Sequence, residues 1–308
     1  MEVKYRINQD KNYSEIFEDI VEFSANYIMK NDLRSAILGI SGGIDSTVVA
    51  AILHETTKRI YEIDPEYDFK FFGYSLPTST TNSKEHHIAR MVGWAFCSQE
   101  GYTTPFFSEH DITDISDKII EDFQEFYGLD KFAKGNIKAR LRMMYLYNKA
   151  RENKGFVVGT DNYTEMLLGF STIGGDALAD YMPLQYLWKT DVYGIARYLV
   201  TKYKDAQDWN KVAAVTASIE IPPQDGLGIS NSDMDQIGAK NYFDVDHILY
   251  VYENFMAEMI YDFSDFIKSE EYNVLTQMYG DAVSNVIMRR RKNFKLNLPI
   301  IYKRGWQN

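Results

Sequence analysis

A short polar turn near the start of the chain carries residue types that bind phosphate. Residues 41–46 read SGGIDS and lie between two apolar runs, 36–40 and 47–53, which predict a buried strand followed by a buried helix. The first amides of a helix have no internal partners and carry the positive end of its dipole, and glycines let a ligand approach the backbone. The turn therefore predicts a site for phosphate or pyrophosphate, with Ser41 and Ser46 as additional donors.

Three charged residues could complete such a site. Asp45 lies inside the turn, where a bare carboxylate would repel phosphate, and a bridging Mg²⁺ would remove that conflict. Glu165 comes in the first turn of a later predicted helix, where it is either a favourable helix-end charge or a second metal ligand. Lys189 starts another predicted helix, against the dipole, which indicates an anionic partner.

The remaining pattern predicts an α/β protein with a Rossmann-like, three-layer parallel-sheet fold and a helical C-terminal region. Strands are expected at 36–40, 68–74, 102–107 and 156–159, and helices at 13–29, 47–59, 83–96, 111–127, 135–151, 189–203, 244–267 and 270–278. The segment 214–229, which contains Thr216, is expected to be a loop. We expect a single domain over 1–308, with a core at about 30–205 and the helical region at about 206–308.

Composition narrows the class of protein. The chain of 308 residues is 45% hydrophobic, so it can bury a large core. A net charge of −11 argues against a general nucleic-acid binder. The single cysteine, Cys97, excludes a disulfide framework within the chain and is expected to be a core residue. With no apolar run of about 18 residues, we predict a soluble, cytoplasmic protein that makes no membrane contact.

Two further segments could bind a ligand. The predicted helix 135–151 is rich in Lys and Arg, and one inward-facing arginine is plausible for an anionic ligand. The glycine-rich segment 169–180 carries Asp176 and Asp180, and its length favours a functional loop.

The turn at 41–46 has neither the lysine nor the spacing of a Walker A loop, and it is not GxGxxG. It resembles the SGGxDS loop of the N-type ATP pyrophosphatases. Three later blocks, KGNIKARLRMMYLY, VVGTDNYTEMLLGF and GGDALADYMPLQYLWKTDVY, narrow the resemblance to ammonia-dependent NAD synthetases and extend it over most of residues 35–220.

The resemblance implies a role for each matching position. Asp45 and Glu165 would hold Mg²⁺, and Asp45, Lys189 and Asp176 would be catalytic. ATP would be bound by Gly39, Ile40, Ser41, Gly42, Gly43, Ile44, Asp45, Ser46, Thr160, Lys189 and Thr216. Deamido-NAD would be bound by Arg140, Asp176, Asp180 and Arg289. The sequence departs from the family at Ser75, where many members have Arg, and at Ile173, where many have Lys.

The same resemblance implies an activity. ATP would activate the carboxylate of deamido-NAD as an acyl-adenylate, and ammonia would then displace AMP to give NAD. The substrates would be ATP, deamido-NAD and ammonia, Mg²⁺ the cofactor and a homodimer the working form. Because the only cysteine lies within the synthetase-like part, no glutaminase nucleophile is expected in this chain.

Two rival functions share the first loop. A tRNA-modifying adenylating enzyme would carry it too, although the acidic composition weighs against an RNA substrate. A nucleotide-binding module without turnover could also use the fold, but it would leave the pair Asp45 and Glu165 unexplained.

Overall fold

Four parallel strands form the centre of the molecule, in the order β3-β2-β1-β4. In the computed structural model, which describes residues 11–98, 105–222, 232–258 and 262–297, they are β1 (Ser35–Gly39), β2 (Lys70–Ser75), β3 (Phe107–Glu109) and β4 (Phe156–Val158). Leu38 is paired with Gly73 of β2 on one side and with Val158 of β4 on the other. β1 is therefore an inner strand, and its carboxyl end leads directly into the turn at 41–46.

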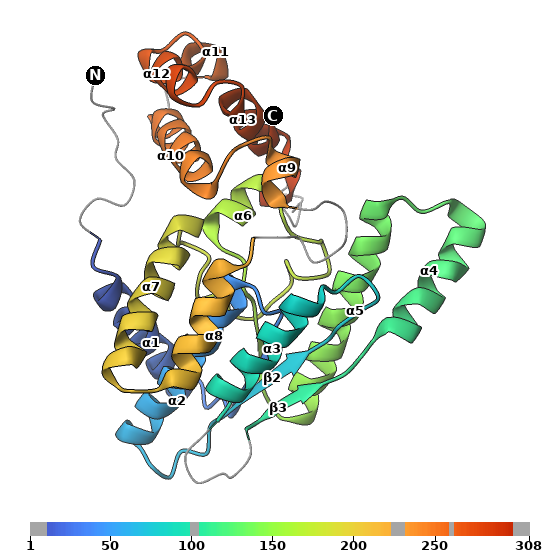
Figure 1. Ribbon diagram of the computed structural model, residues 1–308, viewed down its shortest axis with the longest axis vertical. Helices are drawn as coiled ribbons and strands as arrows, with labels where there is room; N and C mark the ends of the chain where they lie inside the picture. The colour runs from blue at the N-terminus through green and yellow to red at the C-terminus, as the bar shows by residue number, and fades with distance from the viewer. Residues whose placement is uncertain (1–10, 99–104, 223–231, 259–261, 298–308) are drawn as a thin grey trace, which may run out of the picture.

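Helices cover both faces of this sheet (Figure 1). One face packs against α2 (Ile44–Ile63) and α3 (Ser83–Phe96), which in turn contact α1 (Tyr13–Lys30), α7 (Lys189–Asp205) and α8 (Trp209–Glu220). The other face packs against α5 (Lys131–Glu152), with α4 (Thr113–Tyr127) outside it. This three-layer arrangement confirms the predicted fold class.

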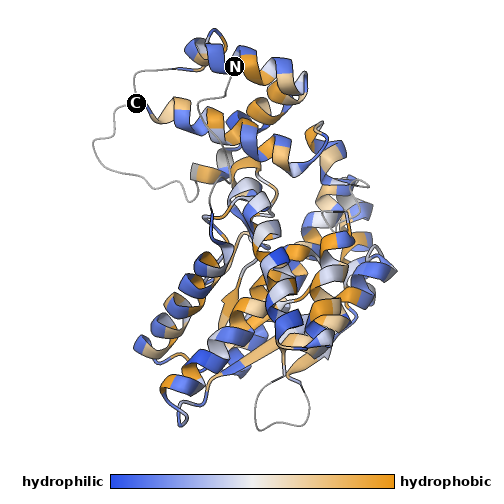
Figure 2. Ribbon diagram, turned by 60° about the vertical axis from the view of Figure 1, so that its left-hand side comes forward, coloured by the Kyte–Doolittle hydropathy of each residue, from blue (hydrophilic) through white to orange (hydrophobic). Residues whose placement is uncertain are grey.

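The alternation of side chains along β1 explains why Ala36, Ile37 and Leu38 are all apolar. Ala36 and Leu38 belong to the hydrophobic cluster on the α2 side, whereas Ile37 belongs to a second cluster with Met143 and Leu146 of α5. A strand covered on both faces reads as a continuous apolar run, as expected for a parallel sheet. Figure 2 shows hydrophobic residues concentrated at the strands and where helices meet them.

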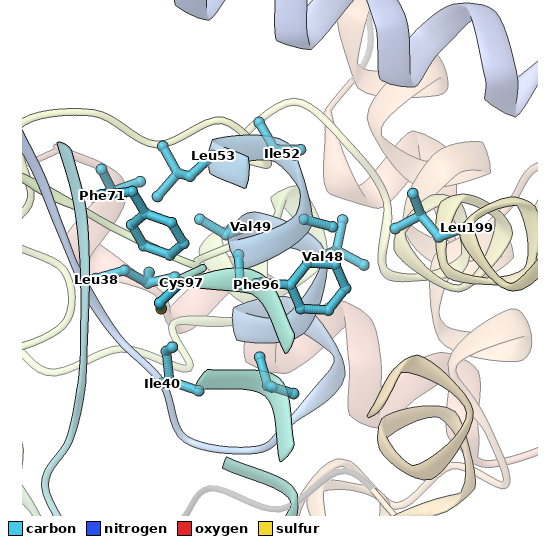
Figure 3. Packing of buried hydrophobic residues seen from close by; sticks show 14 of the residues in the cluster. Leu38, Ile40, Val48, Val49, Ile52, Leu53, Phe71, Phe96, Cys97 and Leu199 are labelled. Atoms are coloured by element: carbon cyan, nitrogen blue, oxygen red, sulfur yellow. The ribbon is translucent and has the colours of Figure 1, made fainter. Parts of the chain in front are cut away.

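From Val48 to Leu53, α2 is apolar on every side because other elements enclose it. Val48, Val49, Ile52 and Leu53 are all 0% exposed, and they pack against strands and neighbouring helices in Figure 3. Cys97, at the end of α3, lies in the same cluster, which confirms that it is a core residue. The turn at 41–46 is thus held by a rigid strand on one side and a fully packed helix on the other.

The C-terminal helices gather at one end of the molecule, above α6 (Tyr163–Leu168) in Figure 1. They are α9 (Asp233–Ile237), α10 (Tyr242–Ala257), α11 (Phe263–Phe266), α12 (Glu270–Tyr279) and α13 (Ala282–Lys292), followed by the 3-10 helix η1 (Phe294–Asn297). Their hydrophobic cluster also includes Leu167 and Leu168 of α6, and Trp188 just before α7. The C-terminal helices therefore pack on the helix that follows β4 and on the residue before α7.

Some predicted elements are wrong in position. Of the predicted loop 214–229, residues 214–220 are helical, since Ala214, Val215 and Ser218 are the buried side of α8, and residues 223–229 lie outside the described part. The third strand is Phe107–Glu109 and not 102–107, of which residues 102–104 lie outside the described part. The predicted helix 244–267 is two helices, because α10 ends at Ala257.

The single domain over 1–308, with its core and its helical region, stays a prediction. In the described ranges, no helix is both long and apolar enough to cross a membrane.

Gly42 generates a prediction about stability. Its φ is +91°, and a Cβ there would lie 2.2 Å from the carbonyl oxygen of Glu85 in α3. We expect Gly42→Ala to lower the free energy of unfolding by at least about 3 kcal/mol, because strain and a backbone clash add. Gly128→Ala is the control, since Gly128 has φ +61° but nothing within 4 Å of its Cβ position, and should cost about 1 kcal/mol. Equal losses of unfolding free energy for the two variants, measured with urea, would disprove the close approach of Gly42 to α3.

Candidate active site

A cavity of about 420 Å³ opens over the carboxyl ends of three neighbouring strands. Ile40 follows β1, Leu76 follows β2 and Gly159 follows β4, and all three line it. In open α/β sheets, ligands bind in the crevice outside the carboxyl ends of the strands. The cavity is therefore the first candidate for the active site.

The turn at 41–46 forms one wall of this cavity. The Oγ atoms of Ser41 and Ser46 are 3.1 Å apart, and Ser46 also donates to the Gly43 carbonyl at 3.0 Å. Gly43 is the N-cap of α2, so no side-chain oxygen caps the first turn of that helix. The start of α2 therefore presents backbone N–H groups to the cavity, as an anion site requires.

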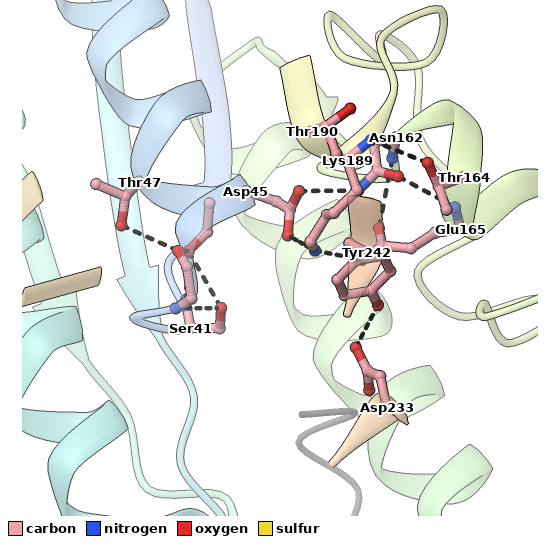
Figure 4. Close-up of polar contacts among 12 residues, drawn as sticks. Ser41, Asp45, Thr47, Asn162, Thr164, Glu165, Lys189, Thr190, Asp233 and Tyr242 are labelled. Atoms are coloured by element: carbon pink, nitrogen blue, oxygen red, sulfur yellow. Dashed lines mark hydrogen bonds and ion pairs between the residues drawn. The ribbon is translucent and has the colours of Figure 1, made fainter. Parts of the chain in front are cut away.

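A buried lysine lies between two carboxylates beside this turn (Figure 4). Lys189 Nζ is 2.5 Å from Asp45 Oδ2 and 2.7 Å from Glu165 Oε1, and Lys189 is only 2% exposed. Asn162 donates from Nδ2 to Asp45 Oδ1 at 2.9 Å. Asp45 comes from α2, Glu165 from α6 and Lys189 from the first residue of α7. Three helices separated in sequence thus meet at one ammonium group.

The anionic partner predicted for Lys189 is present within the protein. Burial disfavours the ammonium, but Asp45 and Glu165 outweigh it and hold the pKa of Lys189 well above its usual value. Burial, and then the charge of Asp45, raise the pKa of Glu165 to about 7. Burial and the nearby Asp176 raise the pKa of Asp161, which also lines the cavity. This crowding of carboxyl groups around one ammonium favours the binding of a further cation.

The donor set fits a magnesium ion. Asp45 and Glu165 already converge on one cation, both line the cavity, and carboxylate oxygens are ligands that Mg²⁺ prefers. A carboxylate can accept about four hydrogen bonds or metal contacts, so each keeps free acceptor sites beside its lysine contact. Within the described ranges, no group of three or more His, Cys, Asp and Glu side chains is placed to hold a metal. Water or substrate oxygens would have to supply the other ligands.

Other predicted residues also line the cavity. Thr160 follows β4, and Asp176 accepts a hydrogen bond from the Thr172 amide at 2.7 Å. Arg289, of α13, donates to the Leu168 carbonyl at 3.0 Å and places its guanidinium 3.9 Å from the Phe170 ring centre. The cavity thus brings together predicted residues that are far apart in sequence, namely Gly39, Ile40, Ser41, Gly43, Ile44, Asp45, Ser46, Thr160, Glu165, Asp176, Lys189 and Arg289.

Four predicted residues lie outside the cavity lining. Gly42 instead touches α3, and Thr216 lies within α8. Arg140 is exposed and donates to the Ile173 carbonyl at 3.1 Å, while Asp180 accepts from the Val157 amide at 2.8 Å. Arg140 and Asp180 therefore fix the loop and the strand that border the cavity, and their ligand roles stay predictions.

Arg142, Lys295 and Asn162 are among the lining or supporting residues that the sequence reasoning missed. Arg142, and not Arg140, is the arginine of α5 that lines the cavity, where it donates to the Leu76 carbonyl at 3.1 Å. Arg142 is four residues after Lys138, which is buried, so the two side chains lie on one face of α5. The spacing of four is visible in the sequence. Lys295 lines the cavity and donates to the Gly169 carbonyl at 2.7 Å, and Asn162 orients Asp45. Neither had a local signal for this role.

Comparison with known proteins agrees with this geometry. The sequence profile of the family described as NAD synthase matches residues 16–297. The chain belongs to the NAD synthase family.

Individual relatives cover most of the chain. It is 30% identical over 292 residues to an NH(3)-dependent NAD(+) synthetase of Chlorobium phaeobacteroides, spanning 95% of this chain and 90% of the relative. It is 33% identical over 242 residues to one of Thermoplasma volcanium, spanning 77% of this chain and 83% of the relative. The family and its ammonia-dependent members were thus correctly identified from the four sequence blocks.

Solved structures share the fold. An NMN synthetase from Francisella tularensis superposes with a TM-score of 0.70 and 21% identity, over 96% of this chain and all of that one. An NH3-dependent NAD synthetase from Campylobacter jejuni gives a TM-score of 0.62 and 22% identity, over 95% of this chain and all of that one. At such identities the likeness establishes the fold alone.

The buried lysine generates a prediction about stability. Lys189→Ala would leave two carboxyl groups facing each other without a cation, so we expect a loss of about 3–5 kcal/mol in the free energy of unfolding. Lys58→Ala is the control, because Lys58 is an exposed partner of Glu55 on α2 and should cost no more than about 1 kcal/mol. Similar unfolding midpoints in urea for the two variants would show that Lys189 is not needed to stabilise the two carboxylates.

Proposed function

We propose that the chain is a ligase that converts deamido-NAD to NAD, using ATP and ammonia and releasing AMP and pyrophosphate. The observation that carries this proposal is the cluster of Asp45, Glu165 and Lys189 beside the SGGIDS turn, in a chain of the NAD synthase family. A phosphate-binding turn with its own acidic and basic groups is what cleavage of ATP between the α and β phosphates requires.

In the first step, an oxygen of the nicotinate carboxylate attacks the α-phosphorus of ATP. A bond from that oxygen to phosphorus forms, the bond from phosphorus to the bridging oxygen breaks, and pyrophosphate leaves. No proton has to be removed because the nucleophile is already an anion. The amides at the start of α2 and the hydroxyl of Ser41 would bind the phosphates, and Lys189 would stabilise the charge that develops on the leaving group.

Mg²⁺ held by Asp45 and Glu165 would neutralise charge on the phosphates when bound. Asn162 would keep Asp45 oriented toward the cavity, since it donates a hydrogen bond to Asp45 Oδ1. The carboxylate of Asp45 would still have acceptor sites for the metal that neither Asn162 nor Lys189 uses. Lys189 is buried, so protein groups and not water surround its ammonium and hold it in place.

In the second step, neutral ammonia attacks the acyl carbon, and AMP leaves as the amide forms. A base must first take a proton from ammonium, or from nitrogen during the attack. Asp176 lines the cavity, and burial raises its pKa, which makes its carboxylate a stronger base near neutral pH. The segment 169–180, part of which lines the cavity, would shield the adenylate from water.

Ammonia is proposed as the direct nitrogen donor in this chain. Its only cysteine, Cys97, is buried in the core, and burial raises the pKa of its thiol, which disfavours the reactive thiolate. A glutaminase nucleophile of the cysteine type is therefore not available here.

The working form is proposed to be a cytoplasmic homodimer. Large apolar side chains are exposed at several places, among them Phe23 and Tyr27 on α1 and Tyr186, at 58%, 44% and 88%. Phe23 and Tyr27 are stacked with ring centres 6.1 Å apart. Exposed apolar groups of this size are common where a partner covers them.

The proposed reaction predicts a strict set of requirements. Purified protein should form NAD only when ATP, Mg²⁺, deamido-NAD and ammonium are all present, and glutamine should not replace ammonium. Chromatography of the products with each component omitted in turn checks this. ATP–pyrophosphate exchange that depends on tRNA, or no exchange with any acceptor, would instead support one of the two rival functions.

A change at Asp45 tests the proposed metal site. Asp45→Asn should keep the fold but lower turnover more than about hundredfold, at least about 2.7 kcal/mol of transition-state stabilisation, because a metal ligand and a charge are lost. Asp68→Asn is the matched control, since Asp68 is exposed beside Lys70 at the opposite end of the sheet. Turnover within about tenfold of the wild type would reject the metal role of Asp45.

A further inference from the structure

We propose that Asp246 is a positioning residue for Lys189, acting through the first turn of α7. It lies on α10, among the C-terminal helices, and none of the sequence motifs points to it. The inference rests on the function proposed above, in which the Lys189 ammonium stabilises the leaving pyrophosphate.

α7 has no side-chain cap for its first amides from its own N-cap residue, although its Asp191 accepts from the amide of Trp188 at 3.1 Å. Its N-cap residue is Trp188, which has no side-chain oxygen to accept from the first amides of the helix. The amide of Lys189 instead donates to Thr164 Oγ1 at 2.9 Å, and the amide of Thr190 donates to Asp246 Oδ2 at 2.8 Å. Side chains from two other helices therefore replace the missing cap.

One carboxylate holds both of these contacts together. Thr164 donates its hydroxyl to Asp246 Oδ1 at 2.6 Å while it accepts from the Lys189 amide, a contact drawn in Figure 4. Thr164 immediately precedes Glu165, so the same link ties the segment that carries Glu165 to the start of α7. Loss of the carboxylate would release both segments that bring charges to the cavity.

The surroundings of Asp246 make a packing role a poor explanation for it. Asp246 and Thr164 are both 0% exposed, and the neighbouring Val245, Ile248 and Leu249 belong to the hydrophobic cluster of the C-terminal helices. A buried carboxylate is costly unless it is hydrogen-bonded, and an apolar residue would fill the same space without that cost. Within the described residues, Asp246 makes no ion pair, so the hydrogen bonds to the two segments are what it contributes.

A second residue on the same face of α10 also contacts Lys189. Tyr242 is four residues before Asp246, which puts both on one side of the helix. Its ring centre is 5.2 Å from Lys189 Nζ, and its hydroxyl donates to Asp233 Oδ2 at 2.6 Å. α10 thus supports the first turn of α7 through Asp246 and the Lys189 ammonium through Tyr242.

The experiment compares Asp246→Asn with a control in the same helical region. In the full-length protein, Asp246→Asn places an amide where two donors now point, so we expect kcat to fall at least about tenfold, with the KM for ATP changed by less than about threefold. The amides of Lys189 and Thr190 should exchange with solvent at least about tenfold faster, followed by hydrogen exchange. Tyr279→Phe removes a hydrogen bond to His247 Nδ1 away from α7, and both readouts should stay within about twofold.

The double variant with Lys189→Ala separates positioning from general loss of stability. If Asp246 acts through Lys189, adding Asp246→Asn to Lys189→Ala should lower the residual turnover by less than about twofold. A further loss of about tenfold or more would overturn the inference, as would wild-type exchange or wild-type kcat in Asp246→Asn. An equal loss of kcat in Tyr279→Phe would also overturn it.

A second pair of variants covers the case in which Asp246→Asn does not fold. Thr164→Val keeps the shape but removes the bridging hydroxyl, and should reproduce the loss of kcat and the faster exchange, whereas Thr164→Ser should recover most of both. The same kcat and the same exchange rates in Thr164→Val and Thr164→Ser would reject the hydrogen-bonded link through Thr164. Because hydrogen exchange needs no turnover, an inactive wild type with these exchange changes would overturn the proposed function and leave the structural link standing.

Discussion

The structure depends most on one buried ammonium group held between two carboxylates. Lys189 is almost inaccessible to water, and an unpaired charge in such a place is strongly unfavourable. Asp45 and Glu165 satisfy it, and each comes from a helix with its own place in the fold. The start of α2, α6 and the start of α7 are therefore tied to one point, and any movement of one helix changes the electrostatic balance at the other two.

The parallel sheet makes this meeting possible. β1 and β4 are neighbours and run in the same direction, so the turn after β1 and the turn after β4 open toward the same side. Asp45 lies near the end of the first of these turns, at the start of α2, and Glu165 follows the second. The helix packing on both sheet faces leaves the carboxyl ends of the strands as the place where polar groups can gather around a ligand.

Local pattern was enough to predict the fold class and the first residues of the candidate site, and the resemblance to a known family supplied the others. The glycine turn between an apolar strand and an apolar helix predicted the first wall of the cavity, and the dipole argument at Lys189 predicted an anionic neighbour. Local pattern could not show which face of a helix points to the cavity when several charged residues lie close together in the sequence. The periodicity of α5 therefore left open which arginine faces the cavity, and the structure places Arg142 there, while Arg140 was assigned from the family resemblance alone. The contribution of Lys295, from the far end of the chain, was missed. Thr216 was placed in a loop because nothing local marks the fact that Ala214 and Val215 pack on the sheet side.

The burial of Cys97 gives the protein an internal reporter. Its sulfur fills the space beside Gly73, where even an alanine Cβ would lie 2.5 Å from it, and the residue is 0% exposed. A water-soluble thiol reagent can reach this one sulfur only when α3 separates from the sheet. The rate of thiol modification in the native protein therefore measures how often the core opens. Cysteines introduced at surface positions could carry spectroscopic labels with little background from the native chain.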